Sequence, residues 1–354
     1  MTDGGPAADG MRVRSRPGCP ACGAEGREIY TGLRDRLFSA PGEWRMVRCA
    51  SSDCGVLWLD PAPLADDLPR AYAGYVRPET LSAPRRRRLR AAVRHGYLAL
   101  RYGAYDDRVS RGQKVLGLVL YAWPLRRLDA DAAVMWLPVV RGGRVLDVGC
   151  GGGGLLTSLV DAGWRAKGID PDGGAVALAM SRGLDVRAGV LPDPAYADGT
   201  FDAVTMSHAI EHVPDPRAVL AEARRILRPG GRLAILTPNG RALGHRWFRA
   251  SWHALDPPRH LSIFPLPVLR HLLEDSGFSI TVATTVPRGI RDLVHGSRAI
   301  ERTGHWVLGA RGGWRDDACV WMLQWLEWAA VKLASVGEEV LLIAERPATE
   351  NAGG

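Results

Sequence analysis

The sequence lacks a hydrophobic run long enough to cross a membrane. Its longest apolar segment, Val115 to Leu125, falls far short of the roughly 20 residues that a spanning helix needs. Met1 to Gly18 is polar and has no apolar core, so no secretory signal peptide is evident. We therefore expect a cytoplasmic protein, for which peripheral attachment to the inner face of the membrane remains open.

Lysine is also scarce. Nearly all of the 46 basic residues are arginine, and with 38 acidic residues the net charge is +8. Such a balance suggests anionic partners, for example a phosphorylated substrate, nucleic acid or a membrane surface. An arginine-rich composition is equally typical of a GC-rich genome, and net charge bears on association, not on fold.

Cysteine is too sparse for a disulfide framework, since the chain has six in 354 residues. In a cytosolic protein such cysteines are metal ligands or buried thiols. Two pairs, Cys19/Cys22 and Cys49/Cys54, are spaced like the ligands of a structural Zn²⁺ site, although the second gap is wider than the usual two residues. We expect a zinc ribbon over 17–62 that needs the metal, because so short a segment has little core of its own. We expect Cys319 to be a buried, unreactive thiol.

The most informative stretch is 144–154. Its apolar residues predict a short buried strand, which runs into Gly149, Gly151 and Gly153 and then a helix over 155–162. Glycine lets the backbone approach a ligand closely, and a helix N-terminus offers free N–H groups. The segment therefore predicts a site for a ligand with a nucleoside part. Its glycines also satisfy the dinucleotide pattern, with Asp170 at a suitable distance, so the loop alone leaves the cofactor open.

Strands and helices alternate regularly after this loop. Strands are predicted at 165–169, 184–188, 202–206 and 232–236, with helices at 173–180 and 215–227 between them. This alternation indicates an α/β fold with a parallel sheet covered on both faces. We divide the chain into a disordered tail (1–16), the zinc ribbon (17–62), a basic helical linker or cap (63–140), the cofactor domain (141–346, with insertions at 239–264 and 288–336) and a second tail (347–354).

Three further motifs follow in order. They are the acidic residue Asp170 after the second strand, the Glu-His-Val-Pro-Asp-Pro stretch at 211–216 and the Leu-Arg-Pro-Gly-Gly turn at 227–231. With the glycine loop, they make residues 142–240 resemble the class I S-adenosylmethionine-dependent methyltransferases of the small-molecule type. The resemblance implies a Rossmann-like, seven-stranded methyltransferase sheet, here with an N-terminal zinc ribbon and helical insertions.

The resemblance also assigns roles to cofactor-binding residues. The glycines would lie along the methionine part, Asp147 would meet its ammonium group, and Asp170 would accept the ribose hydroxyls. The remaining residues are Pro171 at the adenosine, Val190 and Leu191 at the adenine, and Ser207 and His208 near the sulfonium.

Another informative motif, with the sequence Leu-Asp-Pro-Pro-Arg-His-Leu, lies at 255–261. It resembles a segment of bacterial methyltransferases that carry an N-terminal zinc ribbon and act in sugar, glycan or natural-product pathways. His260 is the first candidate for the base that deprotonates the acceptor, and His212 is the second. Arg259 could clamp a phosphate or carboxylate. The alternative is that His260 only pins the loop through hydrogen bonds.

The resulting hypothesis is that the protein is a methyltransferase, which transfers a methyl group to an oxygen or carbon atom of a small-molecule or glycan-type acceptor. A zinc-ribbon RNA methyltransferase is the alternative, but the residues after the fourth strand lack the motifs used on bases, so we do not expect a nucleic-acid partner. If the domain were a non-catalytic binding module, we would expect a damaged glycine loop, whereas this loop is intact. The sequence determines neither the acceptor nor the oligomeric state.

The sequence allows two interpretations of an arginine run and a group of tryptophans. Arg85–Arg88 is typical of a solvated helix face, and the helical spacing of Trp321, Trp325 and Trp328 is typical of core residues. Together with the segment 115–125, they could instead form an interfacial surface for a lipid-linked acceptor.

Overall fold

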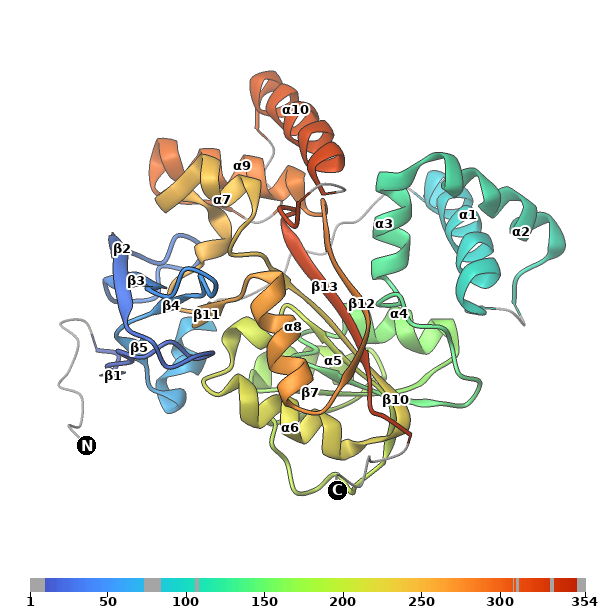
Figure 1. The fold of residues 1–354 in the computed structure, drawn as a ribbon. Helices are drawn as coiled ribbons and strands as arrows, with labels where there is room; N and C mark the ends of the chain where they lie inside the picture. The colour runs from blue at the N-terminus through green and yellow to red at the C-terminus, as the bar shows by residue number, and fades with distance from the viewer. Residues whose placement is uncertain are drawn as a thin grey trace.

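A seven-stranded sheet forms the centre of the molecule (Figure 1). The computed structural model describes residues 10–72, 84–105, 108–307, 309, 312–331 and 334–348. The strand order is β12-β13-β10-β9-β6-β7-β8, and β13 alone runs antiparallel to its neighbours. The strands are β6 (Arg144–Val148), β7 (Arg165–Asp170), β8 (Asp185–Ala188), β9 (Phe201–Ser207), β10 (Leu227–Pro238), β12 (Ser279–Val286) and β13 (Glu339–Glu345). The predicted α/β class and Rossmann-like sheet are confirmed.

Side chains alternate between two cores, one on each face of this sheet. Leu233 and Ile235 of β10 belong to one core, whereas Ala234 and Leu236 belong to the other, as the two-residue period of a strand requires. Helices α6 (Pro216–Ile226) and α8 (Leu266–Asp275) cover the first face, and α4 (Gly154–Ala162) and α5 (Gly173–Ser181) cover the second. The chain reverses its direction of strand addition at β6, and ligands of such sheets bind at the carboxyl ends of the strands beside this point.

The N-terminal region builds a second sheet with the order β11-β4-β3-β2. Its strands are β2 (Gly26–Leu33), β3 (Trp44–Cys49), β4 (Leu57–Leu59) and β11 (Ser262–Ile263). The last of these comes from the predicted insertion 239–264, so the predicted ribbon is completed by a distant segment. Trp58 of β4 shares a core with Phe264 and Leu269. The core of this region is therefore shared with the large domain, as expected of a segment too short to form one of its own.

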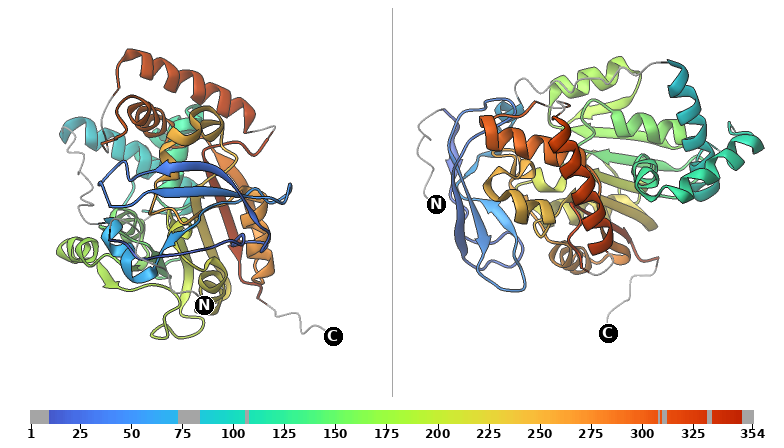
Figure 2. Two further views of the ribbon diagram at one scale, coloured as in Figure 1. Left: turned by 90° about the vertical axis from the view of Figure 1, so that its left-hand side faces the viewer. Right: turned by 90° about the horizontal axis from the view of Figure 1, so that it is seen from above.

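The N-terminal sheet and the helical region 84–132 lie on opposite sides of the molecule (Figure 2). The latter contains α1 (Pro84–Tyr102), α2 (Arg111–Gly117), η2 (Leu118–Ala122) and α3 (Pro124–Ala132). Helices α1 and α2 cross so closely that a Cβ on Gly96 would lie 1.8 Å from the Gln113 carbonyl oxygen. Glycine is required at this crossing. The side chains of Arg85–Arg88 lie outside the described residues.

Part of the predicted N-terminal tail is ordered. Strand β1 (Val13–Arg14) pairs with β5 (Ala62–Pro63), and Arg12 forms an ion pair of 3.0 Å with Asp67 in η1 (Ala65–Tyr72). The prediction of disorder over 1–16 is therefore wrong for 10–16, and residues 1–9 lie outside the described part.

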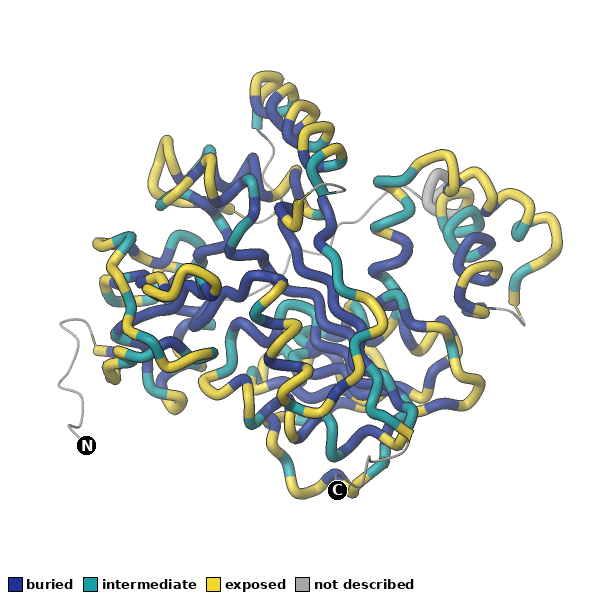
Figure 3. The backbone as a smooth tube through the Cα atoms, viewed as in Figure 1, coloured by how far each residue is buried: buried dark blue, intermediate teal, exposed yellow. Residues whose placement is uncertain are grey.

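Both predicted insertions contain helices. Residues 239–264 contain α7 (Leu243–Phe248), η4 (Arg249–Ser251) and η5 (His253–Leu255), and 288–336 contain α9 (Ile290–Thr303) and α10 (Trp314–Ala330). Helix α10 lies at the periphery of the molecule, with one face buried and the other exposed (Figure 3). Trp321 and Trp325 are each 61% exposed, so the interpretation of these two residues as core is wrong. None of the described helices has the length and apolarity to cross a membrane.

Candidate functional site

The glycine loop forms a cradle at the carboxyl end of β6. Gly149, Gly151 and Gly153 all have positive φ, at 73°, 51° and 84°, a region that side chains rarely adopt. A Cβ on Gly153 would lie 2.2 Å from Leu184, whereas one on Gly151 would meet nothing within 4 Å. The backbone at Gly151 thus faces open space above the N-terminus of α4, where a ligand can lie against it.

Asp170, at the end of β7, is fixed beside this loop. Its carboxylate accepts hydrogen bonds from the backbone N–H of Gly151 at 2.8 Å and of Asp172 at 2.9 Å. Burial raises the pKa of Asp170, and these two bonds oppose the rise. Each oxygen keeps a further acceptor site, so the carboxylate is suited to bind a pair of vicinal hydroxyls.

Asp147 is buried inside β6, and its Oδ1 accepts a hydrogen bond of 2.7 Å from Thr205. Burial raises its pKa to about 7, the Thr205 bond opposes this, and the charge of Asp170 adds to it. No cation contributes within the described part of the chain. A ligand ammonium group near Asp147 would offset the cost of burying this carboxylate.

The other predicted cofactor residues follow the ends of neighbouring strands. Pro171 is exposed directly after β7, Leu191 is buried after β8 while Val190 is exposed, and Ser207 is half-buried at the end of β9. His208 adopts φ 52°. The structure thus places all of them at the carboxyl edge of the parallel strands, on both sides of the β6 switch point.

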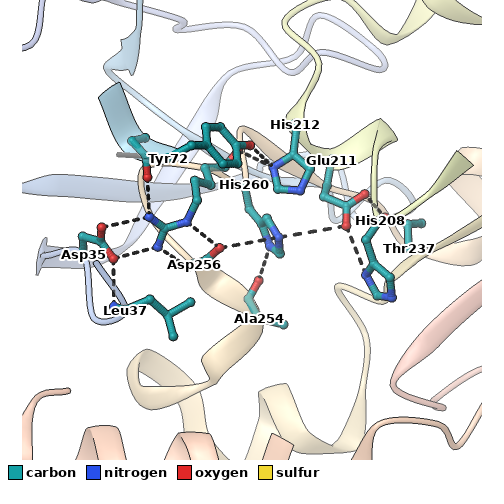
Figure 4. A network of polar contacts seen from close by, with 12 residues as sticks. Asp35, Leu37, Tyr72, His208, Glu211, His212, Thr237, Ala254, Asp256 and His260 are labelled. Carbon is teal, nitrogen blue, oxygen red and sulfur yellow. Dashed lines mark hydrogen bonds and ion pairs between the residues drawn. The ribbon is translucent and has the colours of Figure 1, made fainter. Parts of the chain in front are cut away.

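Beside this edge lies a buried cluster of Glu211, His212 and His260, which we call the Glu-His-His cluster (Figure 4). Glu211 and His212 belong to η3 (Ile210–His212), and His260 comes from the connection after β10. One ligand-capable atom from each residue lies within 4.8 Å of the other two. Both candidate bases of the sequence analysis are therefore brought together.

The hydrogen bonds of the two rings define the tautomer that each adopts when neutral. His260 Nδ1 lies 2.7 Å from the carbonyl oxygen of Ala254, and His212 Nδ1 lies 2.9 Å from that of Arg259. A carbonyl only accepts, so both Nδ1 atoms donate and the Nε2 atoms of the neutral rings carry free lone pairs. Burial, with the charge of His260, lowers the pKa of His212 to about 4.

Glu211 is fully buried, and its two oxygens differ. Oε2 accepts a hydrogen bond of 2.9 Å from Thr237. Oε1 has no hydrogen-bond partner among the described residues, and it lies 3.4 Å from His208 Nδ1 and 4.0 Å from His260 Nε2. Burial raises the pKa of Glu211, but the neighbouring histidines outweigh it and bring the value to about 2.

His208 is held between two carboxylates. Its ring lies 3.4 Å from Glu211 and 3.0 Å from Glu339. Burial lowers the pKa of His208, but these two carboxylates outweigh it and raise the value to about 10. The ring is therefore protonated at neutral pH and suited to positioning Glu211, not to accepting a proton.

Arg259 is only 1% exposed, and all of its five N–H donors are used. They bond to Asp35 at 2.7 and 2.8 Å, to Asp256 at 2.6 and 2.9 Å and to the carbonyl oxygen of Ala71 at 2.8 Å. The prediction that Arg259 clamps a substrate anion is wrong, because no donor remains for a ligand. The residue instead joins the loop after β2, η1 and the connection that carries His260.

Other arginines face a cavity. A cavity of about 650 Å³ lies between the N-terminal sheet and α7, and Arg48, Arg241, Arg246 and Arg249 line it together with His245. These guanidinium groups, unlike that of Arg259, are presented to a space that an anionic group can enter.

The four N-terminal cysteines converge as predicted. Cys19 Sγ lies 3.6 Å from Cys54 Sγ, and Cys22 Sγ lies 3.5 Å from Cys49 Sγ. Four thiolates around one Zn²⁺ at 2.3 Å would be about 3.8 Å apart, whereas a disulfide needs about 2.05 Å. The donor set and its spacing thus fit a tetrahedral structural zinc ion.

Comparison with known proteins agrees with this geometry. Residues 122–282 match a family model described as a methyltransferase domain. This part of the chain is therefore similar to a methyltransferase domain. S-adenosylmethionine is the cofactor of this family, and the glycine cradle with Asp170 fits it.

The curated proteins that resemble this chain align with only part of it, and only part of their own length is aligned. The ubiquinone biosynthesis O-methyltransferase of Xanthomonas oryzae pv. oryzae is 43% identical over 120 residues, which are 32% of this chain and 49% of that protein. That of Aeromonas salmonicida is 39% identical over 127 residues, 33% and 53% of the two proteins. The chain thus spans about half the length of these relatives. A solved geranyl diphosphate C-methyltransferase from Streptomyces coelicolor A3(2) is 17% identical, with a TM-score of 0.43 over 62% of this chain and 78% of that one.

Sequence reasoning missed several residues at the edge of the methyltransferase domain. Glu211 directly precedes His212, and Asp256 lies four residues before His260, so closeness in the sequence could have pointed to both. Asp35 and Tyr72 lie in the N-terminal region, and no local pattern connects them to the site.

We predict that Arg259→Met destabilises the protein strongly. The variant leaves the carboxylates of Asp35 and Asp256 without their cation, and breaking such a buried ion pair costs about 3–5 kcal/mol. Urea denaturation measures the free energy of unfolding. The matched control is Arg270→Met, which breaks an exposed pair with Glu274 and should cost no more than about 1 kcal/mol. Equal losses in the two variants would contradict the role of Arg259.

We predict that the double variant Cys19→Ser/Cys22→Ser loses about one equivalent of zinc relative to the unaltered chain, because two of four thiolates are removed. Elemental analysis of the purified protein measures the metal. Cys319→Ser, which alters a buried cysteine outside the group, should keep all of it. Unchanged zinc in the double variant would show that the cysteines hold no metal.

Proposed function

We propose that the protein is an S-adenosylmethionine-dependent methyltransferase that methylates an oxygen of a small-molecule or glycan-type acceptor. The observation that carries this proposal is the meeting of two features at one sheet edge. The glycine cradle with Asp170 is intact, and the Glu-His-His cluster stands beside it. The relatives named as O-methyltransferases support oxygen over carbon and a small molecule over RNA.

Different residues of the chain act on the methyl donor and on the methyl acceptor. When bound, the cofactor supplies a methyl group already activated on sulfonium. Asp170 holds the ribose hydroxyls, and Asp147 balances the ammonium charge. The enzyme then has to align the acceptor and remove its proton. The Glu-His-His cluster supplies this second function, with the Nε2 of His260 as the free basic atom.

We predict that Asp170→Ala weakens the binding of S-adenosylmethionine by at least about tenfold. The variant removes hydrogen bonds from a charged acceptor, each worth about 1.5–3 kcal/mol, and 1.4 kcal/mol is tenfold in affinity. Calorimetry with the purified protein measures the dissociation constant.

The control for this variant is Asp185→Ala, which removes an exposed carboxylate at the start of β8 that pairs with Lys167. Its affinity should match that of the unaltered chain. If neither the unaltered chain nor the control binds the cofactor, the proposed function fails.

A second proposal concerns the surface of the methyltransferase. We propose that α10 and the α2–η2 segment rest on an anionic lipid bilayer that presents the acceptor. Trp321, Met322, Trp325 and Leu326 form an exposed apolar face on α10, since residues four apart share a helix face. Val115, Leu118 and Trp123 are exposed on or next to α2–η2. Apolar faces rich in tryptophan suit the lipid interface.

We predict that the protein cosediments with vesicles containing phosphatidylglycerol and that Trp321→Ala/Trp325→Ala reduces the bound fraction several-fold, because two apolar anchors are lost. Trp247→Ala, an exposed tryptophan on α7, serves as the matched control and should bind like the unaltered chain. Equal binding of all three proteins would rule out α10 as the lipid-contacting face.

A further inference from the structure

We propose that the Glu-His-His cluster binds a divalent first-row transition-metal ion, separate from the zinc at the cysteines, and that this ion takes the oxygen of the methyl acceptor as a ligand. The donor set is two imidazoles and one carboxylate. Such a set suits Zn²⁺, Mn²⁺ or Fe²⁺, and three protein ligands leave coordination positions open for water or substrate.

The first argument is distance. Metal ligands at about 2.0–2.2 Å from a common ion lie about 3–3.5 Å from one another. The ligand-capable atoms of the cluster all lie within 4.8 Å, and His260 Nε2 is 4.0 Å from Glu211 Oε1. These atoms are too far apart to bond to each other, and small side-chain rotations bring them to the spacing that a shared ion requires.

The second argument is the orientation of the two rings. A histidine that binds a metal through one nitrogen almost always donates its other N–H to a carbonyl or carboxylate, which fixes the tautomer. Both rings meet this condition, because His260 Nδ1 bonds to Ala254 and His212 Nδ1 to Arg259. The Tyr72 hydroxyl lies 3.1 Å from the same His212 nitrogen. The free lone pairs of both rings are therefore on Nε2.

The third argument is a buried carboxylate oxygen that forms no hydrogen bond to any described residue. Glu211 is fully buried, and its Oε1 has no hydrogen-bond partner within the described residues. A buried acceptor without a partner costs about 1–3 kcal/mol, and more when it is charged. Thr237 and His208 hold the carboxylate in place while this oxygen points toward His260, as Figure 4 shows. Among the described residues, the one charged neighbour of Oε1 at closer than 4 Å is the His208 ring at 3.4 Å, so a cation between Oε1 and the two rings would add the short contact that this oxygen lacks.

A metal here deepens the proposed function and rests on it for its catalytic role. The ion would lower the pKa of an acceptor hydroxyl. The hydroxyl proton passes to water, and an electron pair of the oxygen forms the new C–O bond as the C–S bond of the sulfonium breaks. In this arrangement His260 and His212 hold the ion through Nε2, so the ion replaces the free Nε2 of His260 as the group that activates the acceptor hydroxyl.

The test is metal binding without substrate. We would treat the purified protein with a mild chelator, verify that the cysteine zinc remains, and titrate it with Mn²⁺ while following the paramagnetic resonance of the free ion. Mn²⁺ suits this test because thiolates select zinc over manganese. We expect one Mn²⁺ per chain, with a dissociation constant raised at least about tenfold in Glu211→Gln and in His260→Ala.

The matched control is His245→Ala. His245 is also buried and its Nδ1 also lies 2.9 Å from a backbone carbonyl oxygen, that of Gly240, but it is outside the cluster. This variant should bind Mn²⁺ normally. Cysteine zinc content and calorimetry with S-adenosylmethionine show that each variant is folded.

The outcomes separate the two proposals. A chain that binds the cofactor but no Mn²⁺, or whose Mn²⁺ affinity is unchanged in Glu211→Gln, overturns the metal site and leaves the methyltransferase proposal standing. A chain that binds Mn²⁺ in a Glu211-dependent way but no cofactor keeps the metal site and overturns the proposed function.

Discussion

The buried guanidinium of Arg259 is the interaction on which the candidate site depends. Its five donors join a carboxylate of the loop after β2, a carbonyl of η1 and a carboxylate of its own loop, three segments that are distant in the sequence. Removing one partner would leave the others as uncompensated buried charges. The connection between β10 and α8 is thereby held in one position against the N-terminal sheet.

This position determines where the histidines lie. The backbone carbonyl of Arg259 accepts the bond from His212, and the next residue is His260. The backbone N–H of Leu261 bonds to the carbonyl oxygen of Glu211, and β11 then completes the N-terminal sheet. The cysteine-bearing region is therefore part of the support of the active edge, because its sheet and its core are shared with the methyltransferase domain.

A feature of the fold or the site could be predicted from the sequence when the residues that form it lie close together along the chain. The glycine cradle, Asp170 and the cysteine pairs were found because their residues stand close together or at fixed spacing in the sequence. Arg259 was identified but misread, since its partner Asp35 lies far away along the chain. Trp321 and Trp325 were misread because helical spacing shows that residues share a face, but not whether another element covers that face.

The sequence by itself determined the α/β sheet, the cofactor loop and the set of zinc ligands. These depend on periodicity, on backbone freedom and on ligand chemistry, which are properties of short segments. Only the tertiary structure decided that Glu211, His212 and His260 face one another, that Arg259 is occupied and that Trp321 and Trp325 of α10 are exposed. Such relations depend on which distant segments pack together, because burial and charge pairing arise only once the chain has closed around them.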